Sequence, residues 1–485
     1  METKLREMDS VPESGKVPPA RRLTRFDWTV LAVIGLLCAA LALTLALGDR
    51  VGVRVLAAGP LNSAHSTDDI FIQFSEDMNR ASVEMRLLIE PALEGAFRWN
   101  GRMLIFAPAR AMTPGTEYTV ILPRGSKSDG QRQTLAEYRF SFRVGMPRVA
   151  YLSPADGLPN VWVASLDHPQ AAQQVTFSPS GIYDFSVSPE GRRIAFSELD
   201  PLSQSAEIKV LNLDTGALVQ VTNCTAEDSH CTNPVWRPDG NWLAYERIDF
   251  NNDLGSVGVS PTRIWLLDLS VNPPVTRPLF DDSQLLGYGP QWSGDGQRIA
   301  VFDNNTGGIL IYSFADGGLI TVPSRYGTTG TLSPDGLRLV FPEMILDGNQ
   351  TRAYLRIADF GRSTFEALTA PDEPIDDTMP AWNSDGRRLA IGRRYLDERF
   401  TRGAQVYMLD TQNGEVTALV VDARYTNGFF SWDATGDRLV IQRFPELDEF
   451  GNPNPFGRPE VWVYDTQGGL LTQIAVNANR PRWIP

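Results

Sequence analysis

The sequence is poor in the residues from which most metal and nucleophilic sites are built. Three cysteines and three histidines occur in 485 residues. Three cysteines are too few for a disulfide-framework protein. The histidines, His65, His168 and His230, are far apart in the sequence and none has a partner at metal-ligand spacing. We therefore expect no metal ligand, no histidine general base and no cofactor.

Clustered basic charge is also missing. The formal net charge is −14 and the pI is about 4.9. Nucleic-acid binding draws its affinity from clustered Lys and Arg on the phosphate backbone, so this balance argues against a nucleic-acid partner. We interpret the acidic surface as a source of solubility.

Helix-forming patterns are scarce, whereas turn residues are abundant. With 41 Gly and 34 Pro, 42% hydrophobic and 21% charged residues, the composition is that of a folded protein with many turns. The length predicts two to four domains. We expect an all-β fold.

One long apolar run interrupts this pattern. Residues 28–47 read WTVLAVIGLLCAALALTLAL and contain no charge. At 1.5 Å per residue this run matches a hydrocarbon core of about 30 Å, where only a helix satisfies its own backbone. Arg21, Arg22 and Arg25 precede the run, so the positive-inside rule predicts a cytoplasmic tail over residues 1–27 and extracytoplasmic C-terminal domains.

Two alternatives to a single-pass anchor remain for this run. A cleaved signal peptide has a shorter apolar stretch, of about 7–15 residues, although Ala46-Leu47-Gly48 has the small residues of a cleavage site. Residues 35–38, Gly-Leu-Leu-Cys, resemble a lipoprotein box. Bulky Leu37 stands where that processing needs a small residue, so we do not expect lipidation at Cys38.

Residues 50–145 alternate apolar and polar positions in short runs, the pattern of half-buried strands. The runs IFIQFSEDMNRASV, PALEGAFRWNGRMLIFAPARAMTPGTEYTVIL and YRFSFRV resemble the bacterial Ig-like domain of the SbsA type. That resemblance implies a β-sandwich that acts as a spacer or adhesion module without catalysis. We expect Trp99, Ile105, Phe106 and Tyr118 in its core. The acidic pair at residues 76–77 has no third ligand in register, so we interpret it as a solvated turn.

A phrase recurs after residue 146 at a spacing of 40–50 residues, which indicates a propeller or solenoid. It reads FSVSPEGRRIAF, PVWRPDGNWLAY, PQWSGDGQRIAV, GTLSPDGLRLVF, PAWNSDGRRLAI and FSWDATGDRLVI. Each phrase predicts a β-hairpin whose glycine supplies a positive φ. These glycines are Gly191, Gly240, Gly296, Gly336, Gly386 and Gly436. A third and a fourth strand follow each hairpin, as in a propeller blade.

The two ends of the repeat region complement each other. The first repeat lacks its first strand, whereas the chain finishes RPRWIP, with Trp483 in register with the tryptophans of the hairpin phrases. We expect this strand to complete the first blade and close a seven-bladed ring over residues 146–485. The phrases resemble the WD-like repeat of TolB-type propellers, which implies a binding platform.

Cys224 and Cys231 share one short loop. They would pair in an oxidising compartment. Two unpaired thiols are an equally good interpretation of the sequence alone.

Other charged motifs favour structural roles. The arginines at one blade position cover strand surface and pair with turn acids, rather than forming a catalytic cluster. They are Arg193, Arg298, Arg338, Arg388 and Arg438. The acid-rich stretches at 249–253, around Asp376 and around Glu446 lack calcium-loop spacing, so we expect solvated loops.

No catalytic constellation emerges, so we expect a membrane-anchored, extracytoplasmic binding or scaffolding protein rather than an enzyme. Its propeller would present loops to an envelope protein or glycan, with insertions at 250–261, 395–402 and 445–459 as candidates. Two alternatives stay open: a polysaccharide hydrolase or lyase with carboxylates about 5–10 Å apart in the channel, and a purely structural envelope spacer.

Overall fold

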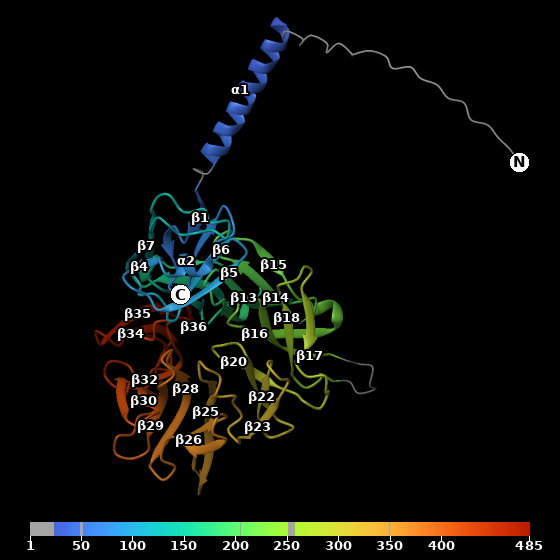
Figure 1. The fold of residues 1–485 in the computed structure, drawn as a ribbon. Helices are drawn as coiled ribbons and strands as arrows, with labels where there is room; N and C mark the ends of the chain where they lie inside the picture. The colour runs from blue at the N-terminus through green and yellow to red at the C-terminus, as the bar shows by residue number, and fades with distance from the viewer. Residues whose placement is uncertain (1–23, 49–51, 204, 251–257, 349) are drawn as a thin grey trace, which may run out of the picture. The chain divides into compact units, whose positions relative to one another are not determined.

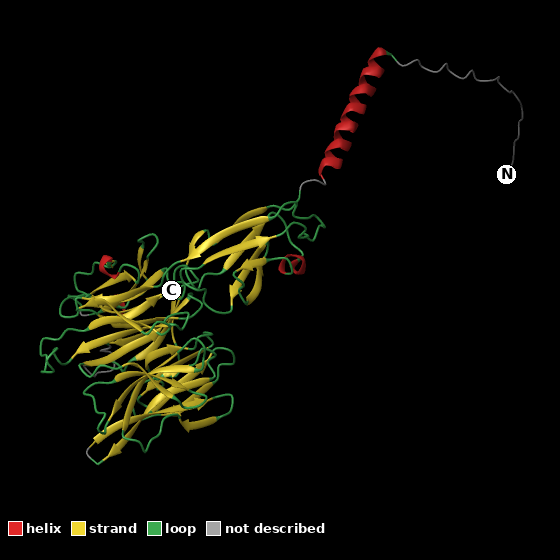
Figure 2. Ribbon diagram, turned by 90° about the vertical axis from the view of Figure 1, so that its left-hand side faces the viewer, coloured by secondary structure: helices red, strands yellow, loops and turns green. Residues whose placement is uncertain are grey.

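The computed structural model describes residues 24–48, 52–203, 205–250, 258–348 and 350–485 (Figure 1). Most of the expected cytoplasmic tail, residues 1–23, lies outside the described residues. The same holds for residues 251–257 of the expected insertion at 250–261. Strands are the main regular secondary structure of the described part, and loops connect them (Figure 2).

Helix α1 (Arg25–Gly48) contains the apolar run. It begins three residues before the run because Thr24 and Asp27 cap it reciprocally: the Thr24 backbone N–H donates to Asp27 Oδ2 at 2.8 Å, and the Asp27 N–H donates to Thr24 Oγ1 at 3.3 Å. Its apolar side chains are exposed, Leu36 by 72% and Leu41 by 63%. In the described part of the chain, α1 is the one helix that is long enough and apolar enough to cross a membrane.

The segment after α1 forms two four-stranded sheets, with strand orders β1-β3-β6-β5 and β2-β8-β7-β4. The strands are β1 (Val55–Gly59), β2 (Asn62–Ala64), β3 (Ile70–Phe74), β4 (Leu88–Glu90), β5 (Gly95–Asn100), β6 (Met103–Pro108), β7 (Glu117–Leu122) and β8 (Tyr138–Val144). A short helix, α2 (Arg80–Glu84), follows β3. Alternate residues are buried along each main strand, as in β3, where Ile70, Ile72 and Phe74 are at most 1% exposed.

Two of the four expected core residues are placed differently. Phe106 and Tyr118 are buried, as expected. Ile105 is half-buried because alternation turns it to the face opposite Phe106, and Leu104 takes the second core position on β6. Trp99 is also half-buried, since it lies on β5 at the end of its sheet.

The described residues after Arg148 form seven four-stranded antiparallel sheets, which we number in chain order. In sheets two to seven the four strands are consecutive in the chain. Sheet one, the closing sheet, has the order β36-β9-β10-β11 and so joins the two ends of the region. Strand β36 pairs with β9, with Trp483 opposite Val149 and Arg482 opposite Ala150. The expected C-terminal closure is therefore present.

Each sheet runs from an inner to an outer strand. The inner strands are β36 (Asn479–Ile484), β12 (Ile182–Val187), β16 (Ser229–Trp236), β20 (Tyr288–Trp292), β24 (Thr331–Leu332), β28 (Ile375–Trp382) and β32 (Tyr425–Trp432). The second strands are β9 (Arg148–Ser153), β13 (Arg193–Leu199), β17 (Trp242–Asp249), β21 (Arg298–Asp303), β25 (Arg338–Asp347), β29 (Arg388–Tyr395) and β33 (Arg438–Pro445).

The remaining strands complete the sheets. The third strands are β10 (Asn160–Ser165), β14 (Ala206–Asn212), β18 (Arg263–Asp268), β22 (Gly308–Ser313), β26 (Gln350–Asp359), β30 (Gln405–Asp410) and β34 (Glu460–Asp465). The outer strands are β11 (Gln173–Gln174), β15 (Leu218–Gln220), β19 (Val275–Pro278), β23 (Leu319–Pro323), β27 (Thr364–Ala367), β31 (Val416–Val420) and β35 (Leu470–Val476). Two short 3₁₀ turns, η1 (Pro169–Ala171) and η2 (Thr225–Glu227), lie in loops.

Apolar clusters fill the spaces between consecutive sheets, including the space between sheets seven and one. Neighbouring residues of a second strand serve opposite clusters: Leu243 packs toward sheet two, whereas Ala244 packs toward sheet four. These strands are therefore buried on both faces and read as continuous apolar runs. The six predicted turn glycines all have positive φ, between 65° and 76°.

Candidate functional site in the propeller channel

The inner strands enclose a channel of about 640 Å³. Its walls are mainly aromatic, proline and small aliphatic side chains, among them Phe185, Trp292, Pro380, Trp382, Phe430 and Trp432. Polar atoms come from Ser186, Asn233 and Gln291. Further polar atoms come from Thr331, Ser384 and Ser431, so the cavity combines aromatic surfaces with hydrogen-bonding groups, as ligand sites do.

A belt of tryptophan side chains ties four of the inner strands to the one before each of them. The indole Nε1–H of Trp292, Trp382, Trp432 and Trp483 donates to the backbone carbonyls of Val235, Thr331, Ala381 and Ser431. The distances are 3.2 Å for the first three and 2.9 Å for Trp483. Four of the five tryptophans in register are thus inter-sheet donors, and Trp483 forms this bond across the closure.

The recurring arginines hold neighbouring hairpins together. Arg193 donates to the carbonyl oxygen of Gly240 at 2.6 Å, Arg298 to that of Gly336 at 2.8 Å, and Arg338 to that of Gly386 at 2.6 Å. Arg388 and Arg438 pair with acids of their own hairpins, Asp385 and Asp433. These contacts agree with the structural interpretation of the repeated position. Sequence reasoning missed Arg237, which reaches the Gly296 carbonyl at 3.0 Å from a different hairpin position.

A second polar layer lies three residues before the belt position. Buried Asp184 accepts hydrogen bonds from the Ser197 hydroxyl and, at 2.8 Å, from the Asn233 backbone N–H. Asn233 Nδ2 in turn donates to Glu246 at 2.8 Å. Burial raises the pKa of the Asp184 carboxyl, and the hydrogen bonds from Ser197 and Asn233 oppose this. Bulges in the inner strands, for example between Thr232 and Val235, turn these side chains out of the regular pleat.

Among the described residues that line the channel, two carry charge: Asp433 and Arg482. Asp433 is 4% exposed and already bound, because it accepts the Asp437 N–H at 3.0 Å and the Thr435 hydroxyl at 2.8 Å. Burial raises its pKa. The pair of carboxylates that glycoside hydrolysis needs is not found among these lining residues. Arg482 forms no ion pair with any described residue.

Arg482 was not singled out from the sequence. The corresponding positions on the other inner strands are Ser186, Val235, Gln291, Thr331, Ala381 and Ser431. None of these is charged. The aligned repeats therefore held the signal: one arginine at a position that is otherwise neutral.

No group of three or more His, Cys, Asp or Glu side chains in the described ranges is arranged to hold a metal ion. His65 follows β2, His168 precedes η1 and His230 lies in β16. The structure does not bring these histidines to the channel lining.

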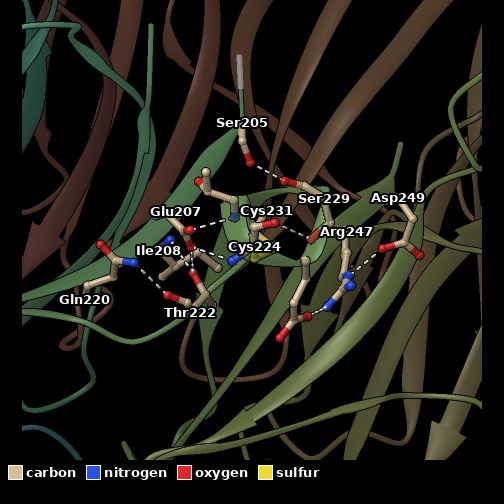
Figure 3. Close-up of a disulfide and its surroundings, with 12 residues drawn as sticks. Ser205, Glu207, Ile208, Gln220, Thr222, Cys224, Ser229, Cys231, Arg247 and Asp249 are labelled. Carbon is tan, nitrogen blue, oxygen red and sulfur yellow. Dashed lines mark hydrogen bonds and ion pairs between the residues drawn. A yellow bond between two sulfur atoms is a disulfide. The ribbon is translucent and has the colours of Figure 1, made fainter. Parts of the chain in front are cut away.

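Cys224, in the loop after β15, forms a disulfide with Cys231 of β16 (Figure 3). Glu207 organises this loop: it accepts the Cys224 N–H at 2.9 Å, the Thr225 N–H at 2.7 Å and the Thr222 hydroxyl at 2.7 Å. Arg247 also pairs with two acids there. The third cysteine, Cys38, is exposed on α1.

One acid-rich stretch was misjudged as a solvated loop. Asp376 and Asp377 belong to strand β28, and Asp377 is fully buried. Its carboxylate receives two hydrogen bonds from Arg393, at 2.7 and 2.8 Å. The expectation failed because the compensating arginine follows 16 residues later, in the paired strand β29.

The two described insertions are held by local ion pairs and turns. In residues 395–402, Asp397 pairs with Arg399, whose guanidinium lies 3.7 Å from the centre of the Tyr395 ring. The hydrogen bond from Arg399 lowers the pKa of Asp397 to about 2. In residues 445–459, Phe450 and Phe456 are 80% and 89% exposed. Both loops therefore offer aromatic or charged groups at the surface.

Comparison with known proteins places the first domain in a family. The model of the bacterial Ig-like domain matches residues 49–144, almost the range expected from the sequence. No curated protein matches the chain.

Solved structures similar to the chain include propellers. TolB from Acinetobacter baumannii is 13% identical, with 90% of this chain and 99% of that chain covered and a TM-score of 0.40. Oligogalacturonate lyase from Vibrio parahaemolyticus is 13% identical, with coverages of 68% and 86% and a TM-score of 0.45. The propeller domain of the trilobed protease from Pyrococcus furiosus is 14% identical, with coverages of 62% and 97% and a TM-score of 0.37.

The propeller fold is established by the sheet order and the closing strand rather than by these TM-scores. Residues 49–144 are a bacterial Ig-like domain, and a β-propeller follows it in the chain.

Proposed function

We propose that this chain is a membrane-anchored extracytoplasmic binding protein whose propeller channel receives its ligand or partner. The observation that carries the binding role is the channel itself, which combines aromatic side chains with an arginine that forms no ion pair with any described residue. Burial of an unpaired charge has a cost in desolvation free energy. An opposite charge on a bound ligand would offset this cost.

Three features support the anchored, exported arrangement. Helix α1 is apolar, exposed and long enough to span a hydrocarbon core. Arginines precede it in the sequence. The Cys224–Cys231 disulfide suits an oxidising compartment and is rare in reducing ones.

The hydrolase or lyase alternative gains no support from the channel. A glycosidase needs two carboxylates, whereas the described lining residues supply Asp433 alone, and its oxygens are already hydrogen-bonded. The described lining residues therefore favour binding over glycoside hydrolysis.

The location can be tested in cells that express the full chain. We expect the chain to stay in the membrane fraction after carbonate washing, and externally added protease to degrade it in spheroplasts. A propeller that is protected in spheroplasts and degraded only after lysis would contradict the proposal.

The binding role needs a variant that blocks the channel without disturbing the fold. Gln291 is exposed on the channel wall, so Gln291→Trp fills the channel from a solvated position. We expect envelope proteins or glycans crosslinked to the wild-type chain to be lost from this variant. A matched change on the exposed outer strand β15, Val219→Trp, should retain them. Equal retention by both variants would contradict binding in the channel.

A further inference from the structure

One tryptophan at the belt position does not take part in the belt. Trp236 occupies the position of Trp292 and Trp382 in the repeat and is 5% exposed. Its indole N–H has no hydrogen-bond partner among the described residues. A buried donor without an acceptor has a cost in free energy, because its hydrogen bond to water is lost and not replaced. The same side chain finds an acceptor in four other sheets, so this cost is specific to one place in the ring.

The neighbouring inner strand carries a hydroxyl group that is also buried without a hydrogen-bond partner among the described residues. Ser186 is 9% exposed, and its Oγ also has no partner among the described residues. A serine hydroxyl can rotate its proton toward any acceptor that enters. Ser186 and Trp236 line one cavity of about 310 Å³.

Arg482 supplies a charge to that cavity. Its one hydrogen bond runs from Nη1 to the carbonyl of the adjacent Pro481, at 3.2 Å. Burial lowers the pKa of the Arg482 guanidinium, the charge of Arg480 lowers it further, and Asp184 opposes both. An arginine keeps its charge through a shift of this kind, so a cation stands in the cavity without a carboxylate beside it.

The rest of the cavity wall is apolar. It consists of Val187, Pro189, Val235, Pro238 and Trp483. Ser186, Val235 and Arg482 also line the channel, so the cavity lies beside it and shares part of its wall. Two buried donors without a partner among the described residues and one charged guanidinium thus belong to residues that line a small, mainly apolar recess beside the channel.

We infer that this recess binds the C-terminal carboxylate of an extended peptide, with the preceding residues in the channel. The inference rests on the proposed binding function and names its ligand class. A carboxylate accepts from a guanidinium and from further N–H and O–H donors at once, and such charge-assisted bonds are about twice as strong as neutral ones. Capture of a terminal carboxylate is a recurring mode of peptide recognition.

The walls favour a peptide over an acidic sugar. A sugar brings hydroxyl groups that need partners when buried, whereas the wall of the recess consists mainly of Trp, Pro and Val side chains. Apolar peptide side chains match these surfaces.

The test uses the full-length chain in detergent and two pools of dansyl-labelled random tetrapeptides, one with free C-terminal carboxylates and one with C-terminal amides. Hydrogen bonds to a charged group are worth about 1.5–3 kcal/mol, so we expect the acid pool to bind roughly 10- to 150-fold more tightly by fluorescence anisotropy. Equal binding of the two pools, binding of neither pool, or displacement of the acid pool by trigalacturonate or inorganic phosphate at equal concentration would overturn the inference.

Variants assign the preference to this recess. Arg482→Gln should reduce the acid-to-amide ratio at least about tenfold. Trp236→Phe should reduce it several-fold, and among the described residues this change removes packing but no hydrogen bond. Trp462→Phe is the matched control: its indole donates to Glu460 outside the cavity, so the ratio should not change.

The two proposals fail separately. If Gln291→Trp abolishes partner capture while acid and amide peptides bind equally, the channel binds but the carboxylate inference is wrong. If the acid preference holds but the propeller proves to be cytosolic, the proposed location is wrong, whereas carboxylate binding by the recess is still supported.

Discussion

Sheet six and the closing sheet carry different residues at the same position, five residues before the belt tryptophan. In sheet six the residue five positions before the belt tryptophan is Asp377, which Arg393 of the next strand neutralises inside the protein. In the closing sheet the corresponding residue is Ala478, fully buried and without a charge to pair. Sheet six is one continuous segment, whereas the closing sheet joins strands more than 300 residues apart in sequence.

Two further sheets extend this comparison. The same position holds Asn427 in sheet seven, which accepts from Arg443 at 3.1 Å, and Cys231 in sheet three, which forms the disulfide. An ion pair, a hydrogen bond from an arginine to a neutral amide, a disulfide and an alanine thus occupy equivalent sites. The repeat specifies the backbone and the belt, while each sheet adds its own link.

Removing the closing strand should have the largest effect on stability. Deletion of residues 480–485 removes buried Ile484 and the Trp483 indole bond and exposes the edge of β9. Loss of one large buried side chain costs roughly 2–5 kcal/mol, so we expect at least about 5 kcal/mol less free energy of unfolding. Urea unfolding measures it, with Arg482→Gln as a control that keeps the strand. An unchanged midpoint would show that the ring does not depend on its closure.

Breaking the buried ion pair of sheet six should come next. Asp377→Asn leaves Arg393 buried without a counter-charge, and breaking such a pair by removing one partner costs about 3–5 kcal/mol. The exposed pair in the nearby loop provides the control, and Asp397→Asn should not change the unfolding midpoint measurably. If the two variants are equally stable, burial of the pair is not what matters in this sheet.

The disulfide of sheet three should contribute less than the ion pair. The double variant Cys224→Ser/Cys231→Ser opens a loop with a sequence separation of seven residues, for which chain entropy gives roughly 2–3 kcal/mol. Calorimetry of this variant beside Cys38→Ser, which changes a thiol on α1, separates the disulfide from a general effect of cysteine. A melting temperature equal to that of Cys38→Ser would mean that Glu207 and its hydrogen bonds hold the loop unaided.

The smallest effect should distinguish two tryptophans at the belt position. Trp382→Phe loses a hydrogen bond to the Thr331 carbonyl, worth about 1 kcal/mol, in addition to a change in packing. Trp236→Phe loses packing alone, because its N–H has no acceptor among the described residues. We expect the first to be less stable than the second by about 1 kcal/mol in chemical unfolding. The reverse order would indicate that Trp236 has an acceptor in solution.

The repeated features of the propeller could be located from the sequence, whereas a side-chain pair between neighbouring strands was misjudged. The turn glycines, the third strands and the closing Trp483 were found because each has a fixed place in a periodic pattern. Asp377 was taken for a loop residue because its partner, Arg393, is not adjacent in sequence. Ile105 was placed in the core beside Phe106, although strand alternation puts the two on opposite faces.

The amino-acid order by itself determined the apolar helix, the Ig-like segment, the hairpin period and the strand that completes the first sheet, since all of these follow from local patterning and chain order. Only the tertiary structure decided which polar groups find partners. Burial of Asp377 beside Arg393 and pairing of Cys224 with Cys231 depend on how neighbouring segments pack within a sheet, and the unpartnered donors of Trp236 and Ser186 depend on which inner strands become neighbours in the ring. Hydrogen-bond satisfaction is a property of three-dimensional proximity, and residues far apart in the sequence supply both donor and acceptor.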